Sequence, residues 1–263
     1  MGAKWPLVFS DSLTTWTHLA ARPRSNRPDR FIAVADPDIP TVASNSAFAS
    51  QISTLPKLPG ARAEANALKL AAPTLTDTLF GADASEIRVR AAAPHARLLH
   101  FAVHALLDAQ QPLDSALVLQ STDTTAEGDG LLHVHEVLED LHLSADLVVL
   151  SGCDTARGQA FQGEGLIGFT RAFQFAGADA VMASLWPVSD RPTAEFMDKF
   201  YHNLLHGTGA ATSLQLALRD TINSAEPLVL AETRGAGALA RSTPVIHAHP
   251  YVWASFQLYG GAQ

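Results

Sequence analysis

Residues 147–158 read LVVLSGCDTARG and residues 100–104 read HFAVH, and these two stretches decide the fold that the sequence predicts. In both stretches an apolar run ends abruptly in a reactive side chain, Cys153 in the first and His104 in the second. Buried strands of a parallel sheet are short continuous apolar runs, and catalytic groups lie at their carboxyl ends. We therefore expect Cys153 and His104 to meet at one edge of a parallel sheet, an arrangement that indicates nucleophilic cysteine chemistry.

Length and charge limit the classes of protein to which the chain can belong. With 263 residues, 47% of them hydrophobic, the chain is long enough for one large α/β domain or two small ones with a real core, which excludes wholesale disorder. The 18 basic residues are outnumbered by 26 acidic ones, and the formal net charge is -8. Because binding to a phosphate backbone requires clustered Lys and Arg, we expect no nucleic acid partner.

The cysteine count and the terminal segment bear on the compartment. A single cysteine, Cys153, forms no intramolecular disulfide, which favours a reducing cytoplasmic compartment. Residues 1–16 lack the long apolar core of a signal peptide, and no run approaches the ~20 apolar residues that span a bilayer. We therefore expect a soluble cytoplasmic protein with no membrane partner.

Strand and helix signals alternate along the chain after a weakly structured leader, residues 1–30, whose last ten residues are typical of a solvated loop. Short apolar runs predict strands at residues 31–35, 97–103, 112–120, 146–150, 180–185 and 250–259. Helical spacing predicts helices at residues 59–72, 85–93, 131–141, 165–177, 193–206 and 210–222. This alternation predicts a single α/β domain with a mostly parallel sheet and helices on both faces.

Cys153 is a candidate nucleophile because of its position in the sequence. It follows Gly152 and precedes the polar run DTARGQ, where burial of the chain should end. A neighbouring imidazole at such a place favours the reactive thiolate. The alternative is that Cys153 is a small buried hydrophobe, which is the usual role of a free cysteine.

His104 is the candidate base, although the chain contains 11 histidines and a chance pairing is common. His100 and His104 are four residues apart and therefore share one side of a strand. If the strand ends near Val103, His104 lies at its rim and His100 stays buried. We expect His104 to act as the base and His100 to have a structural or orienting role, with the reverse assignment as the alternative.

Several separated motifs occur in an order that resembles a known family. They are ADPDIP, LPGARAEANAL, HFAVHALLDAQQPLDSALVL, LLHVHEVL, LSADLVVLSGCDTARGQAFQGEGLIGFTRAFQFAGADAVMASLWPVSD and PYVWASFQLYG. Together they resemble, over roughly residues 8–261, the CHAT domain, a caspase-like module related to separase and often attached to tetratricopeptide repeats. The 49 residues from His104 to Cys153 (153 − 104) are also similar to the spacing in caspases.

The resemblance implies a fold, an activity and a set of site residues. The fold would be a caspase-like three-layer sandwich, and His104 and Cys153 would be the dyad of a cysteine endopeptidase of clan CD. The backbone N–H groups of Ala105 and Cys153 would hold the oxyanion. The partners would be a protein substrate and a regulatory or repeat-containing protein.

Two departures from the family pattern bear on activity. The family usually has HFATHG where this chain has Val103 and Ala105, and alanine is strained there if the position needs a positive φ. The usual opening strand also lacks a counterpart before Trp5, which is typical of a trimmed domain or of one that belongs to a longer chain. The alternative function is therefore a weakly active or inactive CHAT module that acts by binding another protein.

Residues on the loops after the expected strand ends are candidates for substrate binding. Relatives that cut after basic residues have an acidic group in the pocket beside the scissile bond, and the candidates here are Asp154, Glu164 and Asp190. Each has the alternative of being a solvated carboxylate or a helix cap. Trp186, at another strand end, is a candidate for lining the cleft.

Two further motifs support weaker hypotheses. Residues 163–168, GEGLIG, match the dinucleotide fingerprint, but Glu164 would put a negative charge beside the pyrophosphate. The favoured interpretation is that the glycines allow a flexible loop and close helix packing. His133, His135 and Glu136 do not converge on one face of the expected helix, and we expect them to be solvated. We therefore expect no metal and no cofactor.

Overall fold

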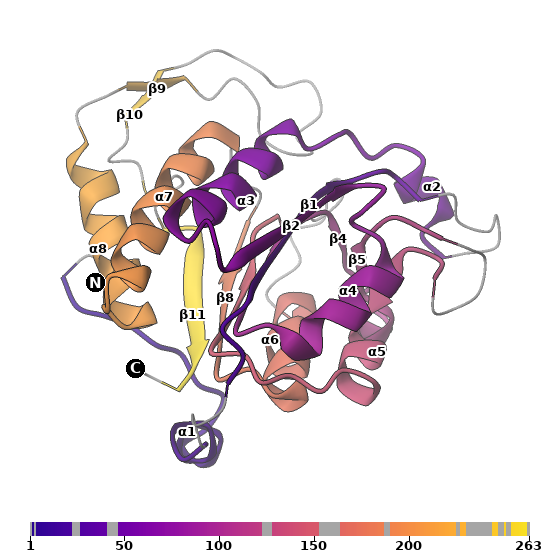
Figure 1. Ribbon diagram of the computed structural model, residues 1–263, viewed down its shortest axis with the longest axis horizontal. Helices are drawn as coiled ribbons and strands as arrows, with labels where there is room; N and C mark the ends of the chain where they lie inside the picture. The colour runs from indigo at the N-terminus through magenta and orange to yellow at the C-terminus, as the bar shows by residue number, and fades with distance from the viewer. Residues whose placement is uncertain are drawn as a thin grey trace.

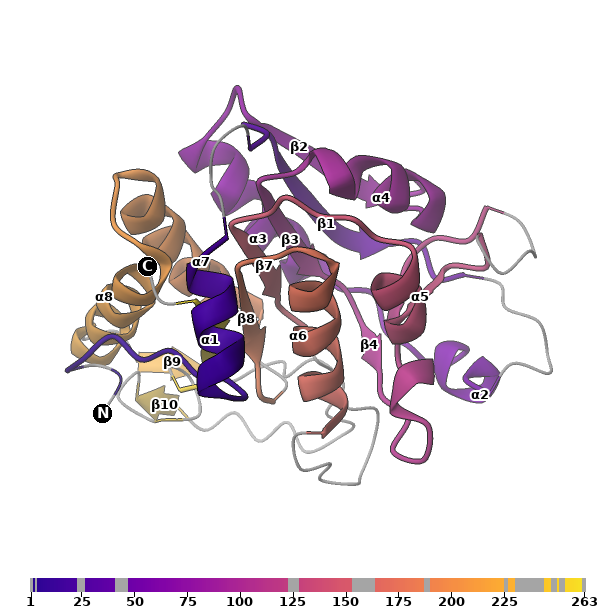
Figure 2. The same ribbon diagram turned by 90° about the horizontal axis from the view of Figure 1, so that it is seen from below.

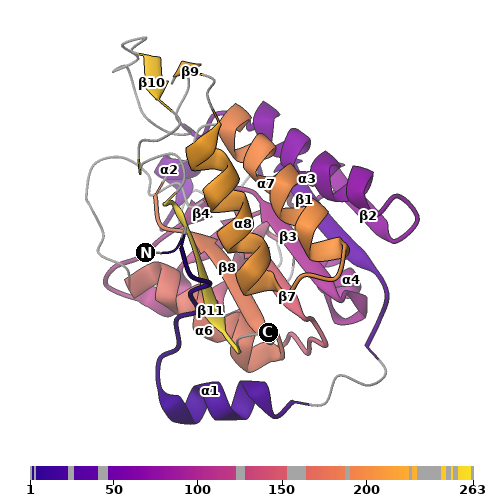
Figure 3. The same cartoon turned by 90° about the vertical axis from the view of Figure 1, so that its left-hand side faces the viewer.

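The computed structural model describes residues 2, 4–22, 27–40, 47–122, 128–152, 164–186, 190–224, 227–229, 244–246, 250 and 254–261. Six strands form the central sheet in the order β11-β8-β7-β3-β1-β2 (Figures 1 and 3). They are β1 (Phe31–Pro37), β2 (Thr76–Gly81), β3 (Leu98–Ala102), β7 (Leu147–Leu150), β8 (Ala180–Ser184) and β11 (Phe256–Gly260). All neighbours are parallel except β11, which pairs antiparallel with β8, so the mostly parallel sheet is confirmed.

Helices cover both faces of this sheet (Figures 1 and 3). One face carries α3 (Pro59–Ala71), α7 (Asp190–Leu205) and α8 (Ala210–Asn223), and the other carries α4 (Glu86–Ala92), α5 (Val134–Glu139) and α6 (Glu164–Ala176). Successive side chains of a strand point to opposite faces, and in β3 Leu99 and Phe101 join the apolar cluster under α4–α6. Leu98 and Ala102 join the cluster under α3, α7 and α8. The three-layer sandwich is therefore confirmed. Helix α3 is one of the helices that pack against the sheet.

A small antiparallel sheet lies beyond the end of β3. Its strands are β4 (Ala105–Leu106), β5 (Ala116–Val118) and β6 (Leu131–His133), and they pack against α2 (Ala49–Ile52). The strand expected at residues 112–120 is shorter than predicted, because η2 (Pro112–Asp114) is a 3-10 turn. The helix expected from residue 131 begins only at Val134, because residues 131–133 pair with β5. The remaining elements are η1 (Ala93–His95), β9 (Pro227–Val229) and β10 (Pro244–Ile246), the last two paired with each other.

The amino-terminal segment contains a helix that the sequence pattern did not predict. This helix, α1 (Leu13–Ala20), lies beside α6, where the Arg22 side chain donates hydrogen bonds to main-chain carbonyls of residues 174 and 178 (Figure 2). Its side chains form no strong apolar stripe, since Leu13 is 76% exposed. The Arg27 side chain, in the expected solvated loop, is instead 8% exposed and forms ion pairs with Asp146 and Asp179. Within the described residues, no helix has both the length and the apolar character needed to cross a bilayer.

A buried carboxylate, Glu86, joins α4 to the small sheet. Its side chain is inaccessible to solvent and accepts hydrogen bonds from the Gly130 N–H at 3.1 Å and from Arg90 at 3.4 Å. Burial raises the pKa of Glu86 to about 7, and the nearby Glu136 carboxylate is the second cause. The neutral acid is therefore favoured in the folded protein at pH values where an exposed glutamate is ionised.

We expect Glu86 to make stability decrease as the pH rises. The pKa of Glu86 is raised from 4.5 to about 7, so between these values the folded protein binds the proton that the unfolded chain releases. Its contribution is fully present below pH 4.5 and is lost as the pH rises through about 7, with a slope of at most about 1.4 kcal/mol per pH unit. Urea unfolding at pH 5, 6, 7 and 8 should show this decrease up to about pH 7 and little further decrease from this group at pH 8, and Glu86→Gln should lose it. Identical pH dependence in the two proteins would refute the assignment.

Candidate active site

His104 lies two residues beyond the end of β3, at the carboxyl edge of the sheet. Its side chain is buried, with 1% of its surface exposed, and Nε2 lies 2.8 Å from the carbonyl oxygen of Pro56. Because a carbonyl oxygen only accepts, Nε2 is the donor of this hydrogen bond. In the neutral ring the lone pair is then on Nδ1, which is the basic nitrogen.

The Pro56 carbonyl is held by the neighbouring strand. Asp36 of β1 accepts hydrogen bonds from the Leu58 N–H at 3.1 Å and from Arg62 Nε at 2.8 Å. Its φ of 45° is a conformation that Asp tolerates better than most side chains because it forms such local hydrogen bonds. The segment that leads into α3 is thus fixed beside β3, and the orientation of the His104 ring depends on it. The sequence pattern did not indicate this role of Asp36.

Ala105 begins β4 and is buried. Within the described residues, Asp36 is the one non-glycine residue with a positive φ, so the backbone strain considered for Ala105 does not occur. The Val118 N–H donates to the His104 carbonyl at 2.8 Å. His104 and Val118 are therefore a hydrogen-bonded pair where the chain enters the antiparallel ladder of β4 and β5. The next pair, Ala105 with Leu117, is then of the non-hydrogen-bonded kind, and the Ala105 N–H points away from β5.

Cys153 and Asp154 lie outside the described residues, and so do the side chains of Glu164 and Asp190. The chain is described as far as Gly152, just after β7, and the Ser151 N–H continues the pairing with β3 by donating to the Phe101 carbonyl at 2.8 Å. Gly152 has a φ of 130°, and its N–H lies 3.5 Å from Ser184 Oγ at the end of β8. The described part of this segment therefore runs beside β3 at the edge where His104 lies.

The other substrate-binding candidates follow neighbouring strands or begin helices. Trp186 is partly buried and lies two residues beyond the end of β8, at the same carboxyl edge as His104. Glu164 and Asp190 are the first residues of α6 and α7. Among these candidates, the described residues place Trp186 at the edge that carries His104.

Beneath this edge lies a buried polar cluster that the sequence pattern did not predict. His100 of β3 is fully buried, and its Nδ1 forms a 2.7 Å hydrogen bond with Tyr201 Oη of α7. Its Nε2 lies 3.8 Å from Glu64 Oε2 of α3, and the same carboxylate oxygen accepts a hydrogen bond from Ser151 Oγ. Burial, and secondly the Glu64 carboxylate, raise the pKa of Tyr201 well above its ordinary value, so the phenol stays protonated.

His133, His135 and Glu136 lie in the small sheet and the start of α5. The two imidazole rings stack with their centroids 5.1 Å apart, although the sequence pattern predicted no convergence. Each Nδ1 atom bonds to a main-chain carbonyl, and Glu136 is buried, accepting hydrogen bonds from the His133 N–H and from Arg90. The expectation that all three residues are solvated is therefore wrong for Glu136. Within the described residues, no group of three His, Cys, Asp or Glu side chains is arranged to hold a metal ion.

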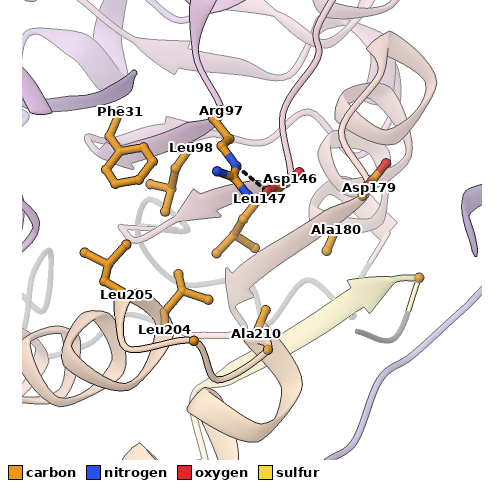
Figure 4. A pocket seen from close by; sticks show the side chains of 13 residues that line it. Phe31, Arg97, Leu98, Asp146, Leu147, Asp179, Ala180, Leu204, Leu205 and Ala210 are labelled. Atoms are coloured by element: carbon orange, nitrogen blue, oxygen red, sulfur yellow. Dashed lines mark hydrogen bonds and ion pairs between the residues drawn. The ribbon is translucent and has the colours of Figure 1, made fainter. Parts of the chain in front are cut away.

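A cavity of about 410 Å³ opens at the opposite edge of the sheet (Figure 4). The first residues of β1, β3, β7 and β8 line it, which are Phe31, Leu98, Leu147 and Ala180. An ion pair of 2.6 Å between Arg97 and Asp146 lies at its margin. Because these strands are parallel, the cavity lies at their amino ends and is separate from the edge that carries His104.

The fold and this edge define an α/β sandwich with a histidine placed where catalytic residues of parallel sheets are found. The chain matches the model of the CHAT domain family over residues 6–261. It belongs to the CHAT domain family, and the three-layer α/β fold expected from its motifs is confirmed.

Curated relatives and solved structures add the following similarities. Tetratricopeptide repeat protein 28 is 28% identical over 261 residues in Mus musculus and 28% identical over 262 residues in Homo sapiens. Each match covers 84% of this chain and 10% of the relative, so the chain spans about a tenth of the length of these relatives.

Two solved structures cover 95% of this chain. The Arg specific cysteine proteinase gingipain R (RgpB) is 13% identical with a TM-score of 0.46, and 51% of that chain is covered. The complex of Porphyromonas gingivalis RgpB pro- and mature domains gives 10% identity, a TM-score of 0.47 and 52% coverage.

We expect Asp36→Ala to destabilise the protein by about 2 kcal/mol, because it removes two hydrogen bonds to a carboxylate and leaves alanine at a positive φ. Asp36→Asn keeps an acceptor and tolerates this φ, so it should cost about half as much. The control is Asp77→Ala, which removes an exposed ion pair with Arg30 and should cost less than about 0.5 kcal/mol. Urea unfolding measures all three, and an Asp36→Ala protein as stable as Asp77→Ala would contradict the expectation.

Proposed function

We propose that this chain is a cysteine endopeptidase of the caspase-like type that cleaves a protein substrate, with Cys153 as nucleophile and His104 as general acid and base. The observation that carries the proposal is the place of His104 at the carboxyl edge of β3, with Nε2 donating to Pro56 and Nδ1 as the basic nitrogen. The adjacent strand β7 ends at Leu150, three residues before Cys153 in the sequence. Membership of the CHAT family supports the same pair of residues.

The proposed reaction begins with transfer of the Cys153 proton to His104. The thiolate attacks the carbonyl carbon of the scissile peptide bond and forms a C–S bond, and the carbonyl oxygen takes the negative charge. As the C–N bond breaks, the His104 imidazolium gives its proton to the leaving amine, and a thioester remains. Water then attacks the thioester carbon while His104 accepts a proton from it. The C–S bond breaks, the carboxylic acid product is released, and His104 returns the proton to the Cys153 sulfur. The net reaction consumes one water for each peptide bond and needs no cofactor.

Stabilisation of the oxyanion is assigned to the backbone N–H groups of Ala105 and Cys153. The direction of the Ala105 N–H, away from β5, supports this role because the group is not used in that ladder. Its normal backbone conformation also removes the objection that alanine would be strained there. A donor of this kind is worth about 3 kcal/mol of barrier in other enzymes.

Recognition of a basic residue before the scissile bond is assigned to the acidic candidates Asp154, Glu164 and Asp190, with Trp186 lining the cleft. This assignment is supported by chain direction, since the segments containing these residues follow the carboxyl ends of β7 and β8. A carboxylate in such a pocket would pair with the charge of Arg or Lys. A protein substrate in the cytoplasm and a regulatory or repeat-containing partner complete the proposal.

The second candidate function is a protein-interaction module with weak or absent catalysis. The observation that favours it is the name of the relatives, tetratricopeptide repeat protein 28, of which this chain spans about a tenth. Such a module would keep the fold without requiring the thiol to be activated.

Alkylation separates the two functions, because Cys153 is the only cysteine and therefore the only thiol that iodoacetamide labels. At pH 7 an unperturbed thiol with a pKa of about 8.5 is only about 3% thiolate, so activation by His104 should raise the labelling rate about 10- to 30-fold. His104→Ala should remove this increase, and Cys153→Ala should abolish turnover of any cleaved protein. The matched control, His142→Ala, changes an exposed histidine and should leave the rate unchanged. Equal labelling of wild type and His104→Ala would favour the interaction module.

A panel of fluorogenic peptides tests the proposed specificity. We expect peptides with Arg or Lys before the scissile bond to be cleaved with a kcat/KM at least about 100-fold above peptides with Ala, because burial of an ion pair discriminates strongly. Replacing the pocket carboxylate by its amide, in Asp154→Asn, Glu164→Gln or Asp190→Asn, should reduce that ratio. Turnover without preference for a basic residue would show that none of the three lines the pocket.

A further inference from the structure

One buried carboxylate, Glu64 of α3, contacts both strands that lead to the proposed dyad. Its side chain is fully buried, and Oε2 accepts a hydrogen bond from Ser151 Oγ and lies 3.8 Å from His100 Nε2. Ser151 follows β7 and precedes Cys153 by two residues in the sequence. His100 is in β3 and precedes His104 by four residues. The same oxygen atom therefore links the two chain segments just before each proposed reactive residue.

The apolar surroundings of Glu64 mean that its carboxylate lowers the stability of the folded protein unless hydrogen bonds compensate. Its helix neighbours Ala61, Ala65 and Leu68 are buried in the apolar layer between α3 and the sheet. Burying an ionised carboxylate costs several kcal/mol unless hydrogen bonds compensate, and a packed apolar residue of similar volume is often as stable or more stable. Core packing alone therefore does not explain a glutamate at this position.

The hydrogen bonds around Glu64 have one consistent arrangement. If Tyr201 donates to His100 Nδ1, the remaining ring proton is on Nε2 and faces the carboxylate. The other tautomer would place the Nε2 lone pair opposite the negative charge, which is unfavourable. Tyr201 keeps its proton because its pKa is raised, and Ser151 donates to the same carboxylate. The chain of donors runs from α7 through β3 to α3, and a second donor reaches α3 from the end of β7.

We propose that Glu64 is a positioning residue, which holds the end of β7 against β3 and so supports the activation of Cys153 by His104. This inference rests on the proposed peptidase function. Backbone pairing between β3 and β7 sets the strand register, but it is described only to the Ser151 N–H. Just after β7, the Ser151 side chain adds a hydrogen bond to Glu64 of α3. A displacement of about 1 Å in a reacting group can lower a reaction rate by about 100-fold. Loss of the Ser151–Glu64 hydrogen bond should therefore have a measurable effect on the reaction rate.

The test compares two variants, Glu64→Leu and Glu64→Gln, each with and without His104→Ala. Two quantities are measured for every protein: the rate of iodoacetamide labelling of Cys153 and the free energy of unfolding. Glu64→Leu keeps the volume and removes the acceptor, so the labelling rate should fall about 10- to 30-fold, to the rate of His104→Ala. Adding His104→Ala to Glu64→Leu should then lower it no further. Glu64→Gln keeps an acceptor oxygen for Ser151 and should stay within about threefold of the wild type.

The matched control is Glu86→Gln, which changes an equally buried glutamate on the opposite face of the sheet and should leave labelling unchanged. Ser151→Ala serves as a second variant where Glu64→Leu fails to fold, and it should lower the rate about threefold by removing the donor alone.

The outcomes distinguish this inference from the function on which it rests. Wild-type labelling that does not depend on His104 would overturn the proposed peptidase and the role of Glu64 together. Labelling that depends on His104 in the wild type and equally in Glu64→Leu would overturn the positioning role alone. Loss of stability without loss of that dependence would show that Glu64 acts only in folding. Unchanged labelling in Ser151→Ala would contradict the proposal where Glu64→Leu cannot be purified.

Discussion

The parallel pairing of β3 with β7 is the interaction on which the candidate site depends. It runs in register from Leu98 with Leu147 to Phe101 with Leu150, and the Ser151 N–H extends it by one hydrogen bond. Parallel strands require a crossover, and here the connecting chain contains the small sheet and α5. Two segments far apart in the sequence, which precede His104 and Cys153, therefore end at the same edge of the sheet.

The two buried glutamates, Glu86 and Glu64, lie on opposite faces of the sheet and in different environments. Glu86 lies among Arg90, Glu136 and the Gly130 N–H, where desolvation and a second carboxylate favour the neutral acid. Glu64 lies in the apolar layer under α3, where Ser151 donates to it and His100 is close by. The first glutamate joins a helix to the small sheet, whereas the second joins a helix to the two central strands. Both are removed from water, but the second lies beside the ends of β3 and β7.

The proposed site and the described cavity lie at opposite edges of the sheet. The described cavity lies at the amino ends of the strands, whereas His104, Trp186 and the end of β7 lie at the carboxyl ends. The family relation supports the fold, but a shared fold does not by itself establish catalysis, so the activity depends on the geometry of a few side chains.

The sequence by itself determined strands β1, β3, β7 and β8, most of the helices and the family, whereas it did not predict β2. Short apolar runs mark β1, β3, β7 and β8 because strands buried on both faces leave a strong local signal, and the order of the motifs identified the CHAT domain. It also indicated that His104 follows a strand. Only the tertiary structure showed that Asp36 holds the loop of Pro56, that Pro56 fixes the tautomer of His104, and that Arg27 is buried. The Glu64 cluster likewise joins residues 87 positions apart in one hydrogen bond and 101 apart in the other. Periodicity reports how a segment faces its immediate surroundings, whereas these contacts depend on which segments the folded chain brings together, and no local pattern contains that information.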